Sequence, residues 1–385
     1  MTAKKKGKGK FLIKLIFIIN ITFAVFLLLS CLAAYLSPAI FWPVAFFGIA
    51  YPFLFIANFL FIIFWLIVRR KFALLSAIII LAGINNVFKL VQYSKVYDAA
   101  EMQDAIKVIS FNVRNFDIYN YKKNWENNFT KKNQIFKFLS KEQPDILCFQ
   151  EYVYDTTHYF KTTDTLKQFL KAKNPHIYFT TNSRNLNFFG IATYTSFPVI
   201  DTGSVVYKTV TGNICIYTDV LINTDTVRIY NVHLESIRLQ SEDYVLAENQ
   251  EENLKNIKDK QKEVTVKEGS ERILKRMKKA YVIRSPQSET VAEHISKCPY
   301  PIILCGDFND TPTSYAYHNI SSKLTDAFIE SGNGTGQSYA GVYPSFRIDY
   351  IMHSKEFLSY NFETVYEEMS DHYPVKCFLK FDKKK

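Results

Sequence analysis

Three long apolar stretches near the N-terminus constrain this chain more than any other feature of its sequence. Phe11–Leu36 carries a single charge at Lys14, Ile40–Val68 carries none, and Phe72–Leu90 reaches its first charge at Lys89. About 20 consecutive apolar residues are enough to cross the hydrocarbon core of a bilayer. We therefore expect a basic head at residues 1–10 and a membrane region at residues 11–95. The membrane region would hold three transmembrane helices, at about 11–36, 40–68 and 72–92.

Two other interpretations of these stretches were weighed. A secretory signal has an apolar core of only about 7–15 residues, which is shorter than the first stretch. Three buried helices of a soluble protein are the second alternative. The third stretch has the weakest signal, because Gly83, Asn85 and Asn86 dilute its apolar character.

The charge of the chain is concentrated in the same region. The 385 residues include 47 Lys and Arg against 36 Asp and Glu, a formal net charge of +11. An excess of this kind is typical of proteins that bind nucleic acid or an anionic membrane surface. However, the first 95 residues contain eleven basic residues and no acidic one, so the remainder is formally neutral. Net charge therefore gives no argument for a nucleic-acid partner.

The basic residues also predict an orientation. Lysines precede the first stretch, the Ser37–Pro38 connection has no basic residue, and Arg69, Arg70 and Lys71 separate the second stretch from the third. By the positive-inside rule, the head and the Arg-Arg-Lys turn are cytoplasmic. Three spans then place the rest of the chain on the outer, periplasmic or extracellular, face of the cell membrane. If the third stretch is only a peripheral helix, the large domain stays cytoplasmic.

Residues 105–385 have the pattern of a folded α/β domain. Short runs rich in β-branched and aromatic residues predict strands, and helical patterns fall between some of them. The predicted strands are Ile106–Phe111, Ile146–Phe149, Ile191–Thr195, Ile214–Ile222, Val227–Val232, Ile302–Cys305, Ile348–Met352 and Val375–Phe381. A helix is predicted at Asn133–Ser140. Four of the six cysteines lie in predicted strands, which indicates reduced core residues rather than disulfides.

A segment at about 236–281 interrupts this pattern. It is dense in Lys, Glu and Gln, and we interpret it as a helical insertion, although an element that faces substrate or membrane is an alternative. Further along, Arg284–Gln287 includes Pro286, which predicts the start of a separate helix.

Polar side chains of a few types follow the predicted strands. These residues include Asn112, Glu151, His233, Asp307, Asn309, Asp349, Asp371 and His372. A lone carboxylate after a strand is unremarkable, but ligands bind α/β proteins in the crevice outside strand ends. We therefore expect these side chains to converge on one site.

The motifs around these residues resemble the endonuclease/exonuclease/phosphatase family, which has the fold of pancreatic deoxyribonuclease. The resemblance runs from about Lys107 to Phe381 and follows the order of the family. Its motifs are Ser-Phe-Asn-Val, Gln-Glu, Asn-Val-His-Leu, Gly-Asp-Phe-Asn, Arg-Ile-Asp-Tyr-Ile and Ser-Asp-His-Tyr-Pro-Val. The resemblance implies a four-layer α/β sandwich, in which two packed, mostly antiparallel β-sheets are flanked by helices.

The resemblance also implies a site. Glu151, Asn112 and Asp371 are the expected ligands of Mg²⁺, for which Mn²⁺ could substitute, since a hard cation prefers oxygen ligands. Asp307 would orient or deprotonate the attacking water with help from Asn309, and an extended segment would point both side chains the same way. His233 and His372 would donate hydrogen bonds to the phosphate oxygens. Asp349 and Asp371 would orient their neighbours, with Asp349 expected to hold His372. The sequence leaves open which aspartate pairs with which histidine.

The expected function is hydrolysis of a phosphoester by a membrane-anchored enzyme. The substrate class stays open among nucleic acid, a phospholipid head group and a phosphorylated small molecule, and the sequence indicates no protein partner. The alternative is a non-catalytic membrane receptor or scaffold that keeps the fold.

Overall fold

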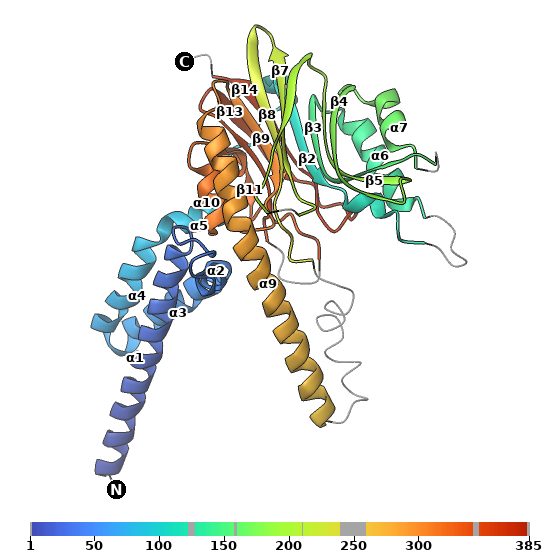
Figure 1. Ribbon diagram of the computed structural model, residues 1–385. Helices are drawn as coiled ribbons and strands as arrows, with labels where there is room; N and C mark the ends of the chain where they lie inside the picture. Colours follow the sequence, from blue (N-terminus) through green and yellow to red (C-terminus); the bar gives the residue numbers. More distant parts are fainter. Residues whose placement is uncertain are drawn as a thin grey trace.

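The computed structural model describes residues 2–121, 128–157, 160–209, 211–238, 259–341 and 346–382. Two six-stranded sheets pack face to face, with helices on both outer sides and a group of apolar helices below one end (Figure 1). The expected four-layer α/β sandwich is confirmed.

Both sheets have the same arrangement of strand directions. Each has one parallel pair at its centre, and all its other pairs are antiparallel. The first sheet has the order β13 (Phe357–Thr364), β14 (Val375–Phe381), β2 (Ile106–Asn112), β3 (Ile146–Asp155), β5 (Asn187–Thr195) and β4 (Asn174–Ser183). The second has the order β10 (Thr325–Asp326), β12 (Asp349–His353), β9 (Ile302–Asp307), β8 (Asp225–His233), β7 (Cys215–Ile222) and β6 (Val199–Val205).

Three buried layers of apolar side chains hold the sandwich together. The middle layer lies between the sheets and includes Val108, Cys148, Ile303 and Cys377. One outer layer covers the first sheet with α6 (Thr130–Glu142) and α7 (Thr162–Phe169). The other covers the second sheet with α9 (Asp259–Ser296) and α10 (Tyr315–Ser321). All six cysteines are unpaired, and the four in strands are buried, as expected for core residues.

The N-terminal region consists of five helices. They are α1 (Thr2–Leu32), α2 (Pro43–Ile49), α3 (Tyr51–Val68), α4 (Arg70–Ala82) and α5 (Ile84–Leu90). Among the described residues, Gly9–Leu32 and Tyr51–Val68 are long and apolar enough to cross a membrane. The second expected span is shorter than predicted, because a break at Ala50 separates α2 from α3.

The third expected span is broken. Helices α4 and α5 are bent by 57° at Gly83, so they could count as one span only together. The 13 residues of α4 are about 20 Å long, which is shorter than a bilayer core. The absence of a side chain at Gly83 lets α1 approach the bend closely, because a Cβ there would lie 2.6 Å from Cys31 Sγ. The Gly83 carbonyl also accepts a hydrogen bond of 2.8 Å from the Tyr51 hydroxyl.

Helix α9 differs from the sequence prediction. Pro286 lies inside the helix rather than at its start, so the expected separate helix does not exist. The Ser285 hydroxyl donates to the Tyr281 carbonyl near this position, in a stretch where proline provides no backbone donor. Of the expected insertion at 236–281, residues 239–258 lie outside the described residues, and residues 259–281 form the N-terminal part of α9.

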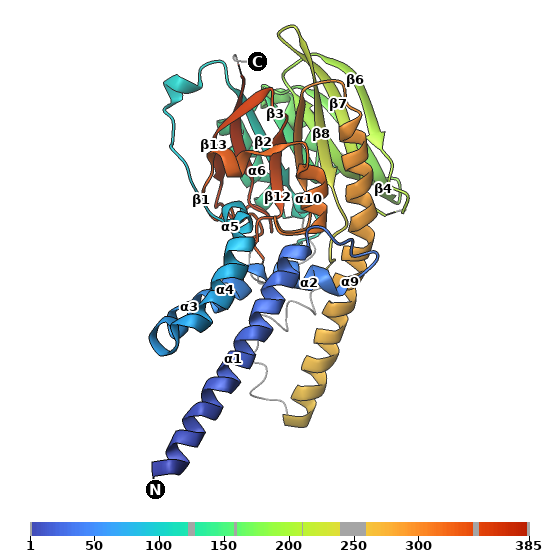
Figure 2. The ribbon, with the colours of Figure 1, turned by 90° about the vertical axis from the view of Figure 1, so that its left-hand side faces the viewer.

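The N-terminal helices contact the sandwich at its strand-end side. Thr313, just after the Gly-Asp-Phe-Asn motif, donates a 2.9 Å hydrogen bond to the Gly48 carbonyl of α2. Arg347, just before Asp349, donates a 2.9 Å bond to the Lys89 carbonyl of α5. Figure 2 shows α2 beside α9 at this junction, while α1 extends away from the sandwich. Residues after one of the site motifs and at the start of another are therefore fixed to the apolar helices.

Candidate active site

The central strands bring the candidate residues to one edge of the sandwich. In the first sheet Asn112 of β2 is opposite Gln150 of β3, and in the second His233 of β8 is opposite Asp307 of β9. Both pairs are parallel, so their carboxyl ends meet at the same edge. Asp349 of β12 is opposite Asp307 on its other side. The site thus forms where the centres of both sheets end.

Two buried amides join the sheets directly behind the site. Gln150 Nε2 donates to Asn231 Oδ1 at 2.7 Å, and Asn231 Nδ2 donates to the carbonyl of Ala192 at 3.0 Å. Asn231 lies in the second sheet, and the other two residues lie in the first. Gln150 directly precedes Glu151, and Asn231 lies two residues before His233. The bridge therefore fixes the two sheet edges that carry these site residues relative to each other.

Asp307 is the fully buried centre of the cluster. Its Oδ2 accepts hydrogen bonds from Asn112 Nδ2 at 2.9 Å and Asn309 Nδ2 at 3.1 Å, and its Oδ1 accepts from the Asn309 backbone at 2.8 Å. Asn309 has a φ of +53°, so a left-handed turn, rather than the extended segment we expected, brings its side chain back to Asp307. Burial raises the pKa of Asp307, and the nearby His372 opposes this rise. A raised pKa makes a carboxylate a stronger base.

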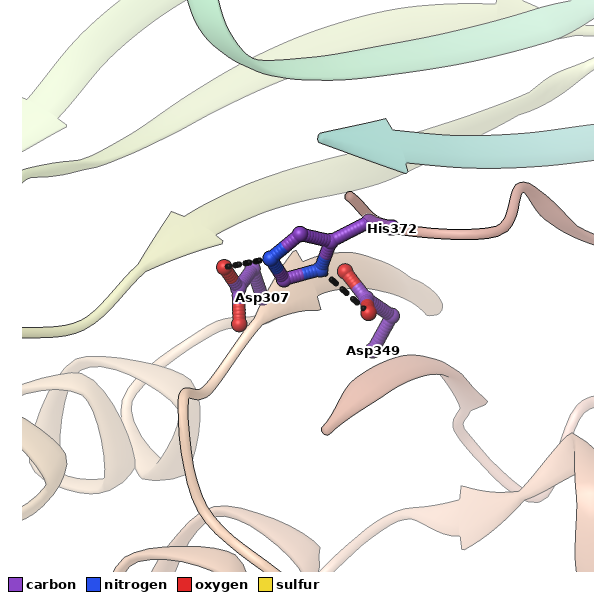
Figure 3. A group of neighbouring side chains, drawn as sticks. All are labelled: Asp307, Asp349 and His372. Carbon is purple, nitrogen blue, oxygen red and sulfur yellow. Dashed lines mark hydrogen bonds and ion pairs between the residues drawn. The ribbon is translucent and has the colours of Figure 1, made fainter. Parts of the chain in front are cut away.

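His372 contacts two aspartates (Figure 3). Its Nδ1 lies 2.8 Å from Asp349 Oδ2, and its Nε2 lies 3.8 Å from Asp307 Oδ2. Burial alone would lower the pKa of His372, but Asp349 and Asp307 raise it well above its ordinary value. The imidazolium form is therefore favoured at neutral pH, with Asp349 as the partner that orients the ring.

His233 has the opposite electrostatic environment. Burial lowers its pKa, although Asp307 works against this. Its Nε2 is buried without a hydrogen-bond partner among the described residues, and it lies 3.8 Å from Asp307 Oδ2 and 4.0 Å from Glu151 Oε1. An unpaired buried ring nitrogen costs free energy unless a ligand contacts it.

Glu151 lies at a β-bulge. The pairing of β3 with β5 shifts between Phe149 and Tyr152, and Glu151 itself has a φ of +52°. Burial and the charge of Asp371 raise the pKa of Glu151 to about 7.

The arrangement offers two groups of metal donors. Asp307, Asp349 and His372 have donor atoms within 4.8 Å of one another and could hold a metal ion. Glu151 and Asp371 line the same cavity as His233, Asn309 and His372. The charge of Asp371 disfavours ionisation of Glu151, and a divalent cation between them would relieve this. The donors thus fit a hard cation.

Asn112 is placed differently from the other expected ligands. Its Nδ2 donates to Asp307 and, at 3.3 Å, to Glu151 Oε1, and its Oδ1 accepts from the Arg114 backbone at 3.1 Å. In this orientation the Asn112 amide nitrogen holds the two carboxylates in place, and the amide oxygen is bonded to the Arg114 backbone.

Several residues of the site were not predicted from the sequence. Arg114 Nε lies 3.5 Å from Asp371 Oδ2, and the Ser338 hydroxyl accepts from the backbones of Ile348 and Asp349 at 3.0 Å. The ring of Tyr339 contacts His372 edge-on, with centroids 5.5 Å apart. Arg114 closely follows Asn112 in sequence, which was the one available signal. Nothing in the sequence distinguished Ser338 or Tyr339 from other loop residues.

Comparison with known proteins identifies the family. The model described as the endonuclease/exonuclease/phosphatase family matches residues 109–372. This chain belongs to that family. Its members are metal-dependent phosphoester hydrolases, which agrees with the carboxylate and histidine cluster. Residues 13–90 match a second model, described as a domain of unknown function. None of the curated proteins compared matches the sequence.

The chain is similar to several solved structures at low sequence identity. The human Nocturnin catalytic domain with bound sulfate is 18% identical and has a TM-score of 0.50, covering 72% of this chain and 95% of its own. A family protein from Leptotrichia buccalis is 14% identical, has a TM-score of 0.49, and covers 72% of this chain and 100% of its own. A third, from Bacteroides thetaiotaomicron, is 16% identical with a TM-score of 0.48, covering 73% and 96%.

Proposed function

We propose that this member of the endonuclease/exonuclease/phosphatase family is a membrane-anchored hydrolase that cleaves a phosphoester with the help of Mg²⁺. The observation that carries the proposal is the convergence of residues from all six motifs around one cavity edge. Glu151, His233, Asn309, Asp371 and His372 line this cavity, while Asp307 and Asp349 are buried behind them.

Glu151 and Asp371 are the proposed metal ligands, and Asn112 holds the Glu151 and Asp307 carboxylates in place. Bound there, a divalent cation would neutralise phosphate charge and stabilise the leaving oxygen. Mn²⁺, which also accepts oxygen ligands, is the expected substitute. We assign the cluster of Asp307, Asp349 and His372 to proton chemistry, because His372 Nδ1 is already engaged with Asp349 Oδ2 at 2.8 Å and Asp307 accepts hydrogen bonds from two asparagines.

Asp307 takes the proton of the attacking water in this proposal. Its burial keeps it basic, and the two bonds from Asn309 orient it. His372 donates from Nε2 to a non-bridging phosphate oxygen, with Asp349 holding the other nitrogen. His233, whose Nε2 has no partner among the described residues, donates a second hydrogen bond in its Nε2-protonated form. These donors are fixed before substrate binds, which is what transition-state stabilisation requires.

Membrane anchoring is supported by the apolar helices and by their geometry. The N-terminus and the α3–α4 turn, which carry the basic residues, both lie at the end of the helices remote from the sandwich (Figure 1). We propose that this end is cytoplasmic and that the catalytic domain lies on the outer face.

Hydrolysis of bis(4-nitrophenyl) phosphate by the full chain tests the reaction. We expect turnover with Mg²⁺ or Mn²⁺ and none in EDTA. Asp307→Asn removes the proposed base and should lower kcat by about 100-fold or more. The matched control is Asp225→Asn, an exposed aspartate at the start of β8, which should leave kcat unchanged.

Metal-independent turnover, or an active Asp307→Asn variant, would contradict the mechanism. No turnover with any metal would favour the non-catalytic receptor or scaffold.

A further inference from the structure

The cavity at the active site is much larger than a phosphate group needs. Its volume is about 1190 Å³. From the polar residues at the strand ends it extends to Ile49 of α2, Phe53 of α3, and Ile273 and Met277 of α9. The cavity therefore has a polar end for phosphorus chemistry and an apolar wall made of helices.

The apolar wall is fixed in place by close contacts. The rings of Phe46 in α2 and Tyr281 in α9 meet edge-on, with centroids 5.5 Å apart. Gly48 lets α2 pack closely against the end of α1, because a Cβ there would lie 3.0 Å from Ala33 Cβ. The hydrogen bond from Thr313 to Gly48 holds α2 against the sandwich. The wall is thus part of the fold and presents apolar surface to whatever occupies the cavity.

The charges along the cavity do not suit a nucleic acid. A polynucleotide is bound mainly through several Lys and Arg side chains that neutralise successive phosphates. Among the described lining residues, the arginines are Arg114 and Arg238. Arg114 is paired with Asp371, and Arg238 Nη2 lies 3.2 Å from Glu235 Oε1. These residues can serve one phosphate, but they do not form a track for a polymer.

The position of the wall indicates where an apolar ligand would come from. Phe53 lies at the sandwich end of α3, which could span a bilayer, and Ile49 ends the short helix α2, which lies next to α9 (Figure 2). Trp42 lies just before α2, and Lys278 Nζ lies 4.8 Å from the centre of its ring. Tryptophan is enriched at the head-group level of membranes. The cavity therefore opens beside the level at which a lipid presents its phosphate.

We propose that the substrate is an amphiphilic phosphate ester taken from the bilayer. Its phosphate lies at Glu151, His233 and His372, and its hydrocarbon chain lies against α2, α3 and α9. This inference rests on the proposed hydrolase function. In the reaction the water oxygen bonds to phosphorus, one phosphorus–oxygen ester bond breaks, and a proton passes to the departing oxygen.

Three esters with the same leaving group test the inference on the full chain in nanodiscs: the methyl, octyl and thymidine-5′ esters of 4-nitrophenyl phosphate. Nitrophenolate release reports the same chemistry in each. Burial of the seven additional methylene groups should raise kcat/KM for the octyl ester by about 30-fold or more over the methyl ester. The thymidine ester should be hydrolysed less efficiently than the octyl ester.

Two variants of α9 separate the cavity from simple partitioning of the octyl ester into the nanodisc. Ile273→Asp places a charge in the apolar wall and should lower the octyl-to-methyl ratio about tenfold. Leu274→Asp is the matched control, because Leu274 is 45% exposed and does not line the cavity, so the ratio should not change.

Three results would overturn the inference and leave the hydrolase proposal intact. They are equal kcat/KM for the octyl and methyl esters, a preference for the thymidine ester, and the same octyl-to-methyl ratio in both variants. No hydrolysis of any ester would instead overturn the hydrolase proposal.

Discussion

Glu151 has a backbone conformation that a glutamate rarely takes. Its φ of +52° costs on the order of 1 kcal/mol and lies at a bulge that interrupts β3. The bulge turns its carboxylate toward Asn112 and the cavity. We interpret this strain as the cost of presenting the proposed metal ligand to the cavity.

The same residue predicts the pH dependence of metal binding. Without metal, the pKa of Glu151 is raised to about 7, so the carboxyl gains a proton as the pH falls below this value. Protons then compete with Mg²⁺, and its affinity should fall as the pH falls from 7 to 5.5, by up to about tenfold per unit for one displaced proton.

The Mg²⁺-induced shift in melting temperature, measured between pH 5.5 and 8, checks this dependence. Glu151→Gln cannot titrate and should bind Mg²⁺ weakly at every pH. A shift that grows as the pH falls would contradict Glu151 as the ligand.

At the scale of elements, a buried polar network joins three of the apolar helices. Trp65 Nε1 donates to Asn20 Oδ1 at 2.8 Å, Asn20 Nδ2 donates to Ser76 Oγ at 2.7 Å, and Ser76 donates to Asn58 Oδ1 at 2.9 Å. The network links α1, α3 and α4 and leaves its amides fully paired within the bundle. Such bonds hold helices together where the surroundings are apolar.

Asn58→Leu should therefore loosen the bundle. It removes the bonds to Ser76 and to the Phe23 carbonyl and leaves the Ser76 hydroxyl, which still accepts from Asn20, without an acceptor for its own proton, for a loss of about 1–3 kcal/mol. Thermal unfolding of the full chain, followed by tryptophan fluorescence, measures the effect, since Trp65 belongs to the network. Phe59→Leu, on the exposed side of α3, is the control and should change stability little.

At the scale of the whole molecule, the catalytic domain and the apolar helices act as one unit. Arg347 shows the connection. Its guanidinium lies 2.6 Å from Asp326, stacks over Phe328 at 4.4 Å, and donates to the Lys89 carbonyl of α5. Arg347 also lies two residues before Asp349. Its buried ion pair with Asp326 therefore holds both the segment that carries Asp349 and the contact with α5 in place.

The orientation of this unit is a testable prediction. In right-side-out membrane vesicles, a cysteine introduced at Asp225 should react with a membrane-impermeant maleimide, because the sandwich would face outward. A cysteine introduced at Lys71, in the first turn of α4, should react only after permeabilisation. Cys31 and Cys298, which are half-buried, would first be replaced by serine. Labelling in the reverse order would place the catalytic domain in the cytoplasm.

The central strands were predictable from sequence and the edge strands were not. Strands such as β3 and β9 are buried on both faces, so each begins with a continuous apolar run, Ile146–Phe149 or Ile302–Cys305. The strands that were missed include β4, β6 and β13, which are edges of the two sheets. An edge strand is half solvated, and polar residues such as those of β4 hide its pattern. The helix start predicted at Pro286 was wrong for a related reason. A proline favours a helix start through local backbone geometry, whereas α9 continues through Pro286 because the helix is stabilised by packing against the second sheet.

The sequence by itself predicted the residue types of the proposed site and their order, because chemistry restricts which side chains can serve phosphate hydrolysis. It also placed the apolar helices, since the bilayer imposes a length. Tertiary structure decided which aspartate contacts His372, the left-handed turn of Asn309 and the contribution of Arg114. It alone decided that the cavity reaches α2, α3 and α9. Those features depend on contacts between residues far apart in the chain, and such contacts leave no local pattern in a sequence.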